Sequence, residues 1–193
     1  MSGAYVLGAD PGLTELRDAD HLLHALAGEL RLPRTAYGCT HLVAGVRPRI
    51  AVSLALGGAG DAAAAWRWLT ARGHAVAGLP GGTRHGPAEA AEAAARAAAE
   101  HAARSVGRAV LYPGADALTG TMTVGELLGS SAIEQVVLLG APHGPPGEAR
   151  MVTRGHVRPQ WLDGRLVLAV IPAAAETLIP FEAPAPTPCC TSR

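Results

Sequence analysis

The residues whose types and spacing most clearly suggest chemistry are the glycines that follow position 56. Gly58, Gly60 and Ala63 fit the pattern Gly-x-Gly-x-x-Gly/Ala. In this pattern the small residues let the backbone approach a phosphate, which the amides at a helix N-terminus then bind. We therefore expect a nucleotide or another phosphorylated small molecule to bind at Gly57, Gly58, Gly60 and Asp61.

The segment 50–79 resembles the first β-α-β unit of a Rossmann-type nucleotide-binding domain. An apolar run at 50–56 precedes the glycines, and a helix and a second strand are predicted after them. The acidic residue that this family places about twenty positions further on, to bind a ribose hydroxyl, is missing. Arg84 could instead meet a 2′-phosphate, which favours NADP over NAD and a reductase. The alternative is a simple tight turn, because a chain with 24 Gly should show this pattern by chance about once.

A second candidate site involves the three cysteines, Cys39, Cys189 and Cys190. Together with His41 they could supply a tetrahedral set of ligands for zinc. The adjacent pair in the tail also suits thiol exchange or soft-metal capture, and it resembles the Cys-Cys tails of mercuric-reductase-like enzymes. The alternative is a tail with incidental thiols.

Composition excludes several enzyme classes. The chain contains no Lys and no Asn, so it has no Walker A loop, no Schiff-base lysine and no Cys-His-Asn triad. The Gly-x-Ser-x-Gly and His-Glu-x-x-His motifs are also absent. His143 and His156 stay as candidate acid or base groups. The sequence therefore leaves open whether the protein is an enzyme.

The elements that must position these residues follow from periodicity and from capping signals. Residues 34–49 look irregular, and Thr123 begins a capping box. Helices are predicted over 14–30, 61–72 and 87–105, strands over 50–56, 74–79, 108–112 and 135–139, and a hairpin over 157–171 with its turn at Asp163-Gly164. Because strands alternate with helices from 50 to 139, we expect an α/β fold with a mainly parallel sheet.

Domain organisation, location and partners complete the sequence-based predictions. We expect one domain over 1–182 and an extended, proline-rich tail over 183–193. The chain begins with no secretory signal and has no apolar run long enough to span a membrane, which predicts a cytoplasmic protein. The net charge of zero and the dispersed arginines argue against nucleic acid. Trp68 is expected to point outward, which suggests a homo-oligomer. The alternative function is therefore a non-enzymatic metal- or thiol-handling protein, or a homo-oligomeric interaction protein, that acts through its tail.

Overall fold

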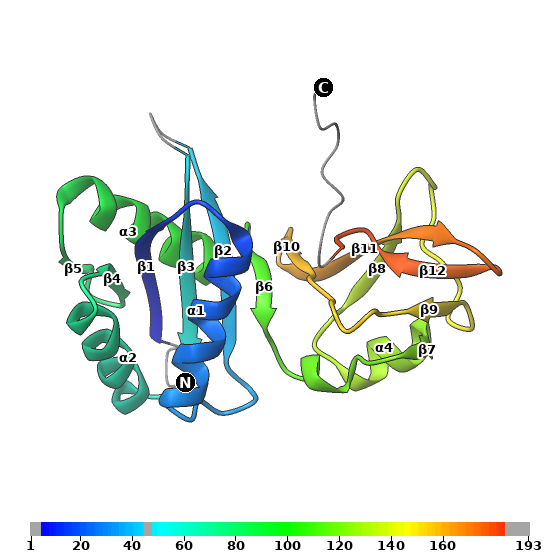
Figure 1. Ribbon diagram of the computed structural model, residues 1–193, viewed down its shortest axis with the longest axis horizontal. Helices are drawn as coiled ribbons and strands as arrows, with labels where there is room; N and C mark the ends of the chain where they lie inside the picture. Colours follow the sequence, from blue (N-terminus) through cyan, green and yellow to red (C-terminus); the bar gives the residue numbers. More distant parts are fainter. Residues whose placement is uncertain (1–4, 45–47, 184–193) are drawn as a thin grey trace, which may run out of the picture. The chain divides into compact units, whose positions relative to one another are not determined.

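The computed structural model describes residues 5–44 and 48–183, which divide into two compact units (Figure 1). Unit 1 comprises the chain up to Pro113 together with Gln160–Arg165, and unit 2 comprises Gly114–Pro159 and the chain from Leu166 onward. That residues 1–182 act as one domain stays a prediction. The proposed tail falls almost entirely outside the described residues.

Unit 1 is built on an antiparallel sheet with the strand order β5-β4-β1-β3-β2-β6-β10. Its elements are β1 (Tyr5–Leu13), α1 (Leu16–Glu29), β2 (Tyr37–Val43), β3 (Arg49–Leu56), α2 (Ala59–Ala71), β4 (Ala75–Leu79), β5 (Thr83–His85), α3 (Ala88–Ala102), β6 (Arg108–Leu111) and β10 (Gln160–Leu162). The first six elements follow the order β-α-β-β-α-β, with β1 between β4 and β3. This is the split β-α-β arrangement of ferredoxin-like folds.

The prediction of a mainly parallel, Rossmann-like sheet is wrong. The predicted β-α-β segment exists as β3, α2 and β4, but β3 and β4 are not neighbours. Strand β1, which the sequence patterns do not predict, lies between them and pairs antiparallel with both. The segment predicted to be irregular is also a strand, β2, which pairs antiparallel with β3 and β6.

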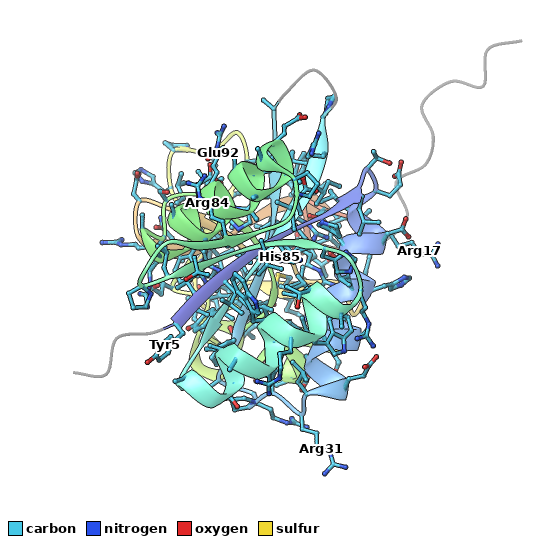
Figure 2. The ribbon with its side chains drawn as sticks, turned by 90° about the vertical axis from the view of Figure 1, so that its left-hand side faces the viewer. Tyr5, Arg17, Arg31, Arg84, His85 and Glu92 are labelled. Carbon is cyan, nitrogen blue, oxygen red and sulfur yellow. The ribbon has the colours of Figure 1, made fainter. Side chains whose placement is uncertain are left out.

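Helices cover both faces of the sheet of unit 1, with α1 and α2 on one face and α3 on the other (Figure 2). The first face is a conventional apolar core. It buries Leu23 and Leu26 of α1, Leu54 of β3 and Leu69 of α2. The predicted amphipathic helix over 14–30 is confirmed as α1, because its leucines at helical spacing form this contact.

The second face is packed with small residues instead. Helix α3 buries mostly alanine, and β1 presents Gly8 opposite it. A Cβ atom built on Gly8 would lie 1.9 Å from the carbonyl oxygen of Ala94. Since real Cβ atoms do not approach a backbone so closely, α3 can sit at its observed distance only because position 8 is glycine.

Unit 2 contains a smaller mixed sheet. Its elements are the short 3₁₀ turn Ala115–Ala117, β7 (Thr121–Thr123), α4 (Val124–Ser130), β8 (Gln135–Leu138), β9 (Arg150–Val152), β11 (Arg165–Ala173) and β12 (Thr177–Pro180). Strand β11 pairs antiparallel with β12 and parallel with β8, while β9 pairs parallel with β12 and antiparallel with β7. The capping box predicted at Thr123 is confirmed, with Glu126 as its reciprocal partner.

The strand β10 belongs to unit 1 although it comes almost fifty residues after β6 in the chain. It brings Trp161 against Tyr37, with 5.7 Å between the ring centroids, and the Arg104 guanidinium lies 5.0 Å from the indole ring. The predicted two-residue turn follows directly, since Asp163 and Gly164 have φ angles of 49° and 82°. A distant segment thus completes the first unit.

Two further expectations concern surfaces. In the described part of the chain, no helix is long and apolar enough to cross a membrane.

Trp68 does not stand free on α2, because its indole nitrogen donates to Glu29 on α1 at 2.7 Å and Arg72 stacks on its ring at 3.7 Å. This contact between helices accounts for Trp68 without a second subunit, and a homo-oligomer stays a prediction.

Candidate functional site

The glycine turn joins β3 to α2 and is open. Gly58 is the N-cap residue of α2 and makes no side-chain capping bond, while Gly60 and Asp61 lie in the first turn. A Cβ atom built on Gly57, Gly58 or Gly60 would meet nothing within 4 Å. The turn is therefore not plugged by neighbouring side chains, and the first amides of a helix have no partner within the helix itself.

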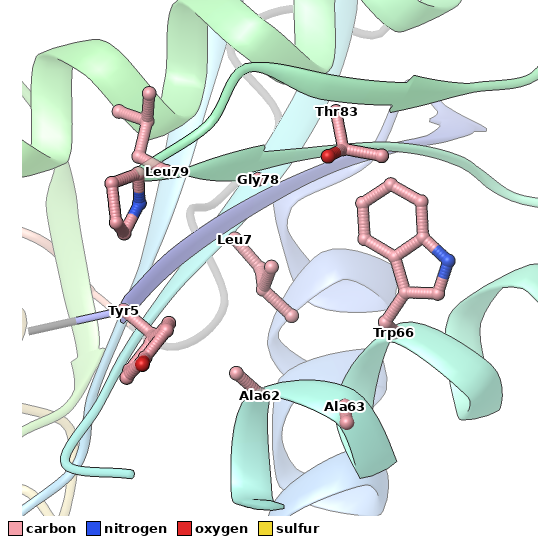
Figure 3. Close-up of a pocket in the computed structure, with 9 residues that line it drawn as sticks. Tyr5, Leu7, Ala62, Ala63, Trp66, Gly78, Leu79 and Thr83 are labelled. Carbon is pink, nitrogen blue, oxygen red and sulfur yellow. The ribbon is translucent and has the colours of Figure 1, made fainter. Parts of the chain in front are cut away.

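A pocket of about 210 Å³ lies beside this turn, between α2 and the strands β1, β4 and β5 (Figure 3). Its lining residues are Tyr5, Leu7, Ala62, Ala63, Trp66, Gly78, Leu79, Pro80 and Thr83. Two contacts join it to the glycine turn: Tyr5 pairs with Leu56, the last residue of β3, and the amide of Ala62 donates to the Gly58 carbonyl. The pocket therefore lies about one helical turn from the start of α2, although no residue of 57–61 lines it.

The chemistry of the pocket is apolar and aromatic. Among the described residues that line it, none carries a charge, and the polar side-chain groups are the hydroxyls of Tyr5 and Thr83 and the indole N–H of Trp66. The six-membered ring of Trp66 lies close to the bare backbone of Gly78, where a Cβ atom would be 3.5 Å away. Such a lining suits a flat, uncharged ring.

Arg84 does not join this surface. Thr83 pairs with Gly78 and faces the pocket, so the next residue along the strand points to the opposite face of the sheet. There the Arg84 guanidinium forms an ion pair with Glu92 of α3. The structure does not bring Arg84 to the glycine turn, which removes the reason for favouring NADP.

The zinc hypothesis can be followed only in part, because Cys189 and Cys190 lie outside the described residues. Cys39 and His41 both lie on β2 and face α3, where Gly107 packs against them. Burial raises the pKa of Cys39 to about 12, despite an opposite effect of the Trp161 indole. Both ring nitrogens of His41 are already engaged, as described next. A protonated thiol and an occupied imidazole are poor zinc ligands.

The described residues contain no group of three or more potential metal ligands. In unit 2, His143 is exposed, and Nε2 of His156 lies 2.8 Å from Oε1 of Glu182. Both histidines belong to unit 2, whereas the residues that line the pocket belong to unit 1.

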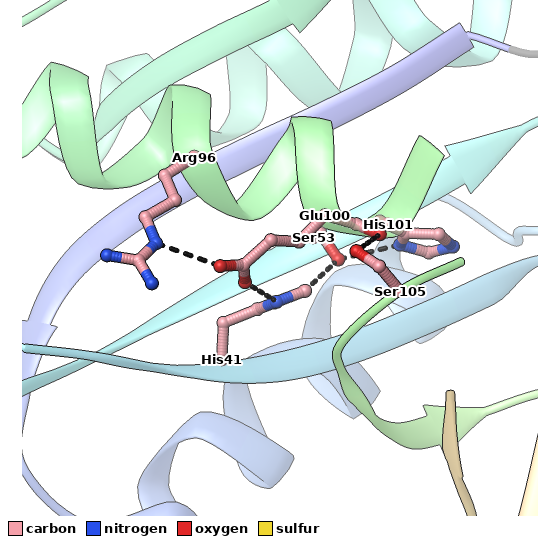
Figure 4. A network of polar contacts seen from close by, with 6 residues as sticks. All are labelled: His41, Ser53, Arg96, Glu100, His101 and Ser105. Atoms are coloured by element: carbon pink, nitrogen blue, oxygen red, sulfur yellow. Dashed lines mark hydrogen bonds and ion pairs between the residues drawn. The ribbon is translucent and has the colours of Figure 1, made fainter. Parts of the chain in front are cut away.

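The structure also reveals a buried polar network that no sequence motif predicts (Figure 4). Nδ1 of His41 lies 3.0 Å from Oε2 of Glu100, and its Nε2 lies 2.7 Å from the Ser53 hydroxyl. That hydroxyl is 2.6 Å from Nδ1 of His101. Arg96 donates to the other oxygen of Glu100 at 2.8 Å. The network links β2, β3 and α3.

Burial sets the charge states in this network. Desolvation lowers the pKa of His41 despite the adjacent Glu100 carboxylate. It also lowers the pKa of His101 to about 3, with further contributions from the charges of His41 and Arg104. Burial raises the pKa of Glu100, but hydrogen bonds from Arg96 and His41 outweigh this effect and the pKa is lowered. At neutral pH both histidines are therefore uncharged.

The order Glu100–His41–Ser53 is that of an acid–histidine–serine triad, but the site lacks access. Ser53 is only 1% exposed and His41 is 1% exposed. Ser53 pairs with Gly8, over which α3 packs so closely that no substrate could reach the hydroxyl. We therefore assign these residues to holding α3 on the sheet. The only signal in the sequence was the adjacent Glu100-His101 pair near the end of an alanine-rich helix.

Comparison with known proteins gives no family assignment. No protein-family model matches the chain, and neither a curated protein nor a solved structure matches it. Any function must therefore be argued from the pocket, the turn and the buried network.

Proposed function

We propose that unit 1 binds a small molecule in which a flat, uncharged ring is joined to an anionic group such as a phosphate. The ring occupies the pocket between Tyr5 and Trp66. The anionic group reaches the glycine turn at Gly57–Asp61. A nucleotide or another phosphorylated aromatic compound fits this description.

The observation that supports the proposal is the short distance along α2 between the pocket and the open start of the helix. Ala62 lines the pocket and lies one helical turn from Gly58, which corresponds to about 6 Å along the helix axis. The first amides of a helix carry a partial positive charge and favour an anion. Stacking on aromatic rings and a helix N-terminus would thus act on two ends of one ligand.

Asp61 allows a test of whether the ligand carries a negative charge at the glycine turn. Its exposed carboxylate lies in the first turn of α2, where it interacts favourably with the helix dipole and repels an anionic ligand. Replacing it with asparagine removes the repulsion and keeps the shape. Asp61→Asn should therefore bind an anionic ligand more tightly and an uncharged ring with unchanged affinity.

The test is a thermal-shift screen followed by calorimetric titration of any compound that stabilises the protein. The panel pairs adenosine with ATP and riboflavin with flavin mononucleotide, and it includes NADP, S-adenosylmethionine and inorganic phosphate. A ligand present at 100 times its Kd should add about 2.7 kcal/mol to the free energy of unfolding. We expect the phosphorylated member of a pair to bind more tightly than its parent.

Two variants of α2 provide a test of the pocket and its matched control. Trp66→Leu removes an aromatic wall of the pocket and should weaken binding about tenfold, which is about 1.4 kcal/mol. Trp68→Phe changes a tryptophan outside the pocket and should leave the affinity unchanged. The proposal is refuted if no compound binds at millimolar concentration, or if Trp66→Leu binds as tightly as the unaltered protein.

A further inference from the structure

The network beneath α3 is a continuous chain of hydrogen bonds with defined ends. It runs from Glu100 through His41 and Ser53 to His101, with successive distances of 3.0, 2.7 and 2.6 Å. The two histidines and Ser53 are at most 4% exposed. Three elements of the fold, β2, β3 and α3, each contribute to it (Figure 4).

Counting protons fixes the direction of every bond when both histidines are uncharged. The Glu100 carboxylate can only accept, so Nδ1 of His41 carries a proton and its Nε2 accepts one from Ser53. The hydroxyl has only that one proton. It must therefore accept from His101, whose Nδ1 carries the proton in turn. Only one arrangement satisfies the chain.

One additional proton can be accommodated by reversing part of the chain. The proton enters at Nε2 of His101, and the Nδ1 proton of that ring passes to the Ser53 oxygen. The former hydroxyl proton passes to Nε2 of His41. His101 is again neutral, now protonated on Nε2 and accepting from Ser53, and His41 is a cation that donates to both Ser53 and Glu100. No atom is lost, and all bonds are still made.

We propose that a buried one-proton relay is formed by Glu100, His41, Ser53 and His101. It stores a single proton on His41 and reverses the direction of its hydrogen bonds in doing so. It releases α3 when a second proton arrives. This property is independent of ligand binding at the pocket. A second proton would leave two cationic rings donating to one hydroxyl, with a single carboxylate nearby. The hydroxyl proton would then lose its acceptor.

The charged groups around the chain favour His41 as the storage site. Glu100 lies against His41, and Arg96 contacts the far oxygen of that carboxylate. Near His101 the charged neighbour is Arg104, whose cation opposes a proton there. Strand β2 adds Cys39, which stays a neutral thiol because burial raises its pKa. Strand β1 presents Gly8 to this face, and the facing positions of β3 and β4 are Ser53 and Ala77.

Nitrogen-15 NMR of the histidine side chains between pH 7.5 and 4 tests the relay, because it distinguishes the two neutral tautomers from the cation. At neutral pH we expect both rings to be protonated on Nδ1. On acidification His41 should become a cation with the same midpoint at which His101 changes to the Nε2-protonated form. His143, which is exposed, serves as a reference ring.

Two variants separate a relay from two independent histidines. In Ser53→Ala the connection is cut, so His101 should keep one tautomer while His41 titrates. In Glu100→Gln the stored cation loses its partner, and the His41 midpoint should fall by at least one pH unit. The Gln side chain can still accept from Nδ1, so this variant keeps the fold even if Ser53→Ala does not.

Three results for the uptake of the first proton would overturn the proposal. They are separate midpoints for the two rings, a His101 tautomer that does not change in the unaltered protein, and unfolding before His41 takes up its proton. Amide hydrogen exchange gives the last readout: protection of Ala97–Ala102 should persist after the first proton and be lost before that of α1. Simultaneous loss in both helices would contradict the release of α3.

Discussion

Gly8→Ala is the substitution whose effect the structure defines most sharply. The new methyl group would lie 1.9 Å from the Ala94 carbonyl oxygen and 2.9 Å from the Ala98 amide nitrogen. Both atoms are backbone, so no side-chain rotation can relieve the overlap. Strand β1 cannot move away either, because it is paired with β3 and β4 on its two sides.

The magnitude follows from the shift that α3 would need. Restoring an ordinary contact of 3.4 Å requires a displacement of about 1.5 Å. Overpacking in a core costs about 1–3 kcal/mol, and the rigid surroundings place this site at the upper end. The same displacement would stretch the 2.6 Å bond between Ser53 and His101 beyond hydrogen-bond distance, at about 1 kcal/mol more. We expect Gly8→Ala to lower the free energy of unfolding by about 4 kcal/mol.

Urea denaturation followed by circular dichroism measures this change. Gly28→Ala is the matched control, since position 28 is exposed on α1 and a Cβ atom there meets nothing within 4 Å. It should leave stability unchanged or raise it by up to about 1 kcal/mol. If Gly8→Ala is as stable as the control, the close packing of α3 on β1 is refuted.

Three more outcomes follow from buried groups. The pKa values of His41 and His101 lie below 6.5 in the folded state, so the unfolded chain binds more protons in acid. The free energy of unfolding should therefore fall as the pH drops from about 6.5 toward 3, by up to about 1.4 kcal/mol per pH unit for each ring. Replacing both rings with glutamine should flatten this pH dependence in urea titrations. Arg108→Ala should cost about 3–5 kcal/mol in the same assay, because it removes the guanidinium that binds the buried Asp20 carboxylate at 2.6 and 3.1 Å, and a loss under 1 kcal/mol would contradict this account. Cys39 should resist alkylation at pH 8 in the folded protein and react fully in denaturant, as peptide mass spectrometry would show.

The local pattern of the sequence was sufficient for most elements but not for their pairing. The leucine spacing of α1 and the alanine-rich α3 gave helices close to their observed bounds, and the run at 50–56 gave β3. The parallel sheet was inferred because β3, α2 and β4 follow one another. Adjacency along the chain does not fix adjacency in a sheet, however, and the unrecognised strand β1 takes the place between them.

Two of the strands that were not predicted, β1 and β2, have unusual compositions for physical reasons. Strand β1 reads Tyr-Val-Leu-Gly-Ala-Asp-Pro-Gly-Leu, and its glycine is required by the close approach of α3. Strand β2 carries buried Thr40 and His41, which bond to partners on other elements. Both segments are strands because of packing against residues that are distant in the sequence, and local propensities do not include such contacts.

The candidate site was predictable only where it depends on local backbone. The glycine turn lies at the start of a helix as expected, because glycines between a strand and a helix report on local conformation. The wall of the pocket was not predictable, since Tyr5 and Trp66 come together only through the order of the strands. Arg84 was expected to meet a phosphate, but it lies on the opposite face of the sheet from the pocket, and that face depends on the pairing of β5 with β4.

The late strand β10 has a consequence for synthesis of the protein. A ribosome that has completed residues 1–113 has synthesised every helix of the first unit, yet Trp161 is still to be translated. Until then Tyr37 lacks its aromatic neighbour and the Gly107 carbonyl lacks the Trp161 amide that it accepts from at 2.9 Å. The nascent first unit therefore exposes its β6 edge to the cell while the second unit is being made, and this interval is when it is most open to chaperones and to mispairing.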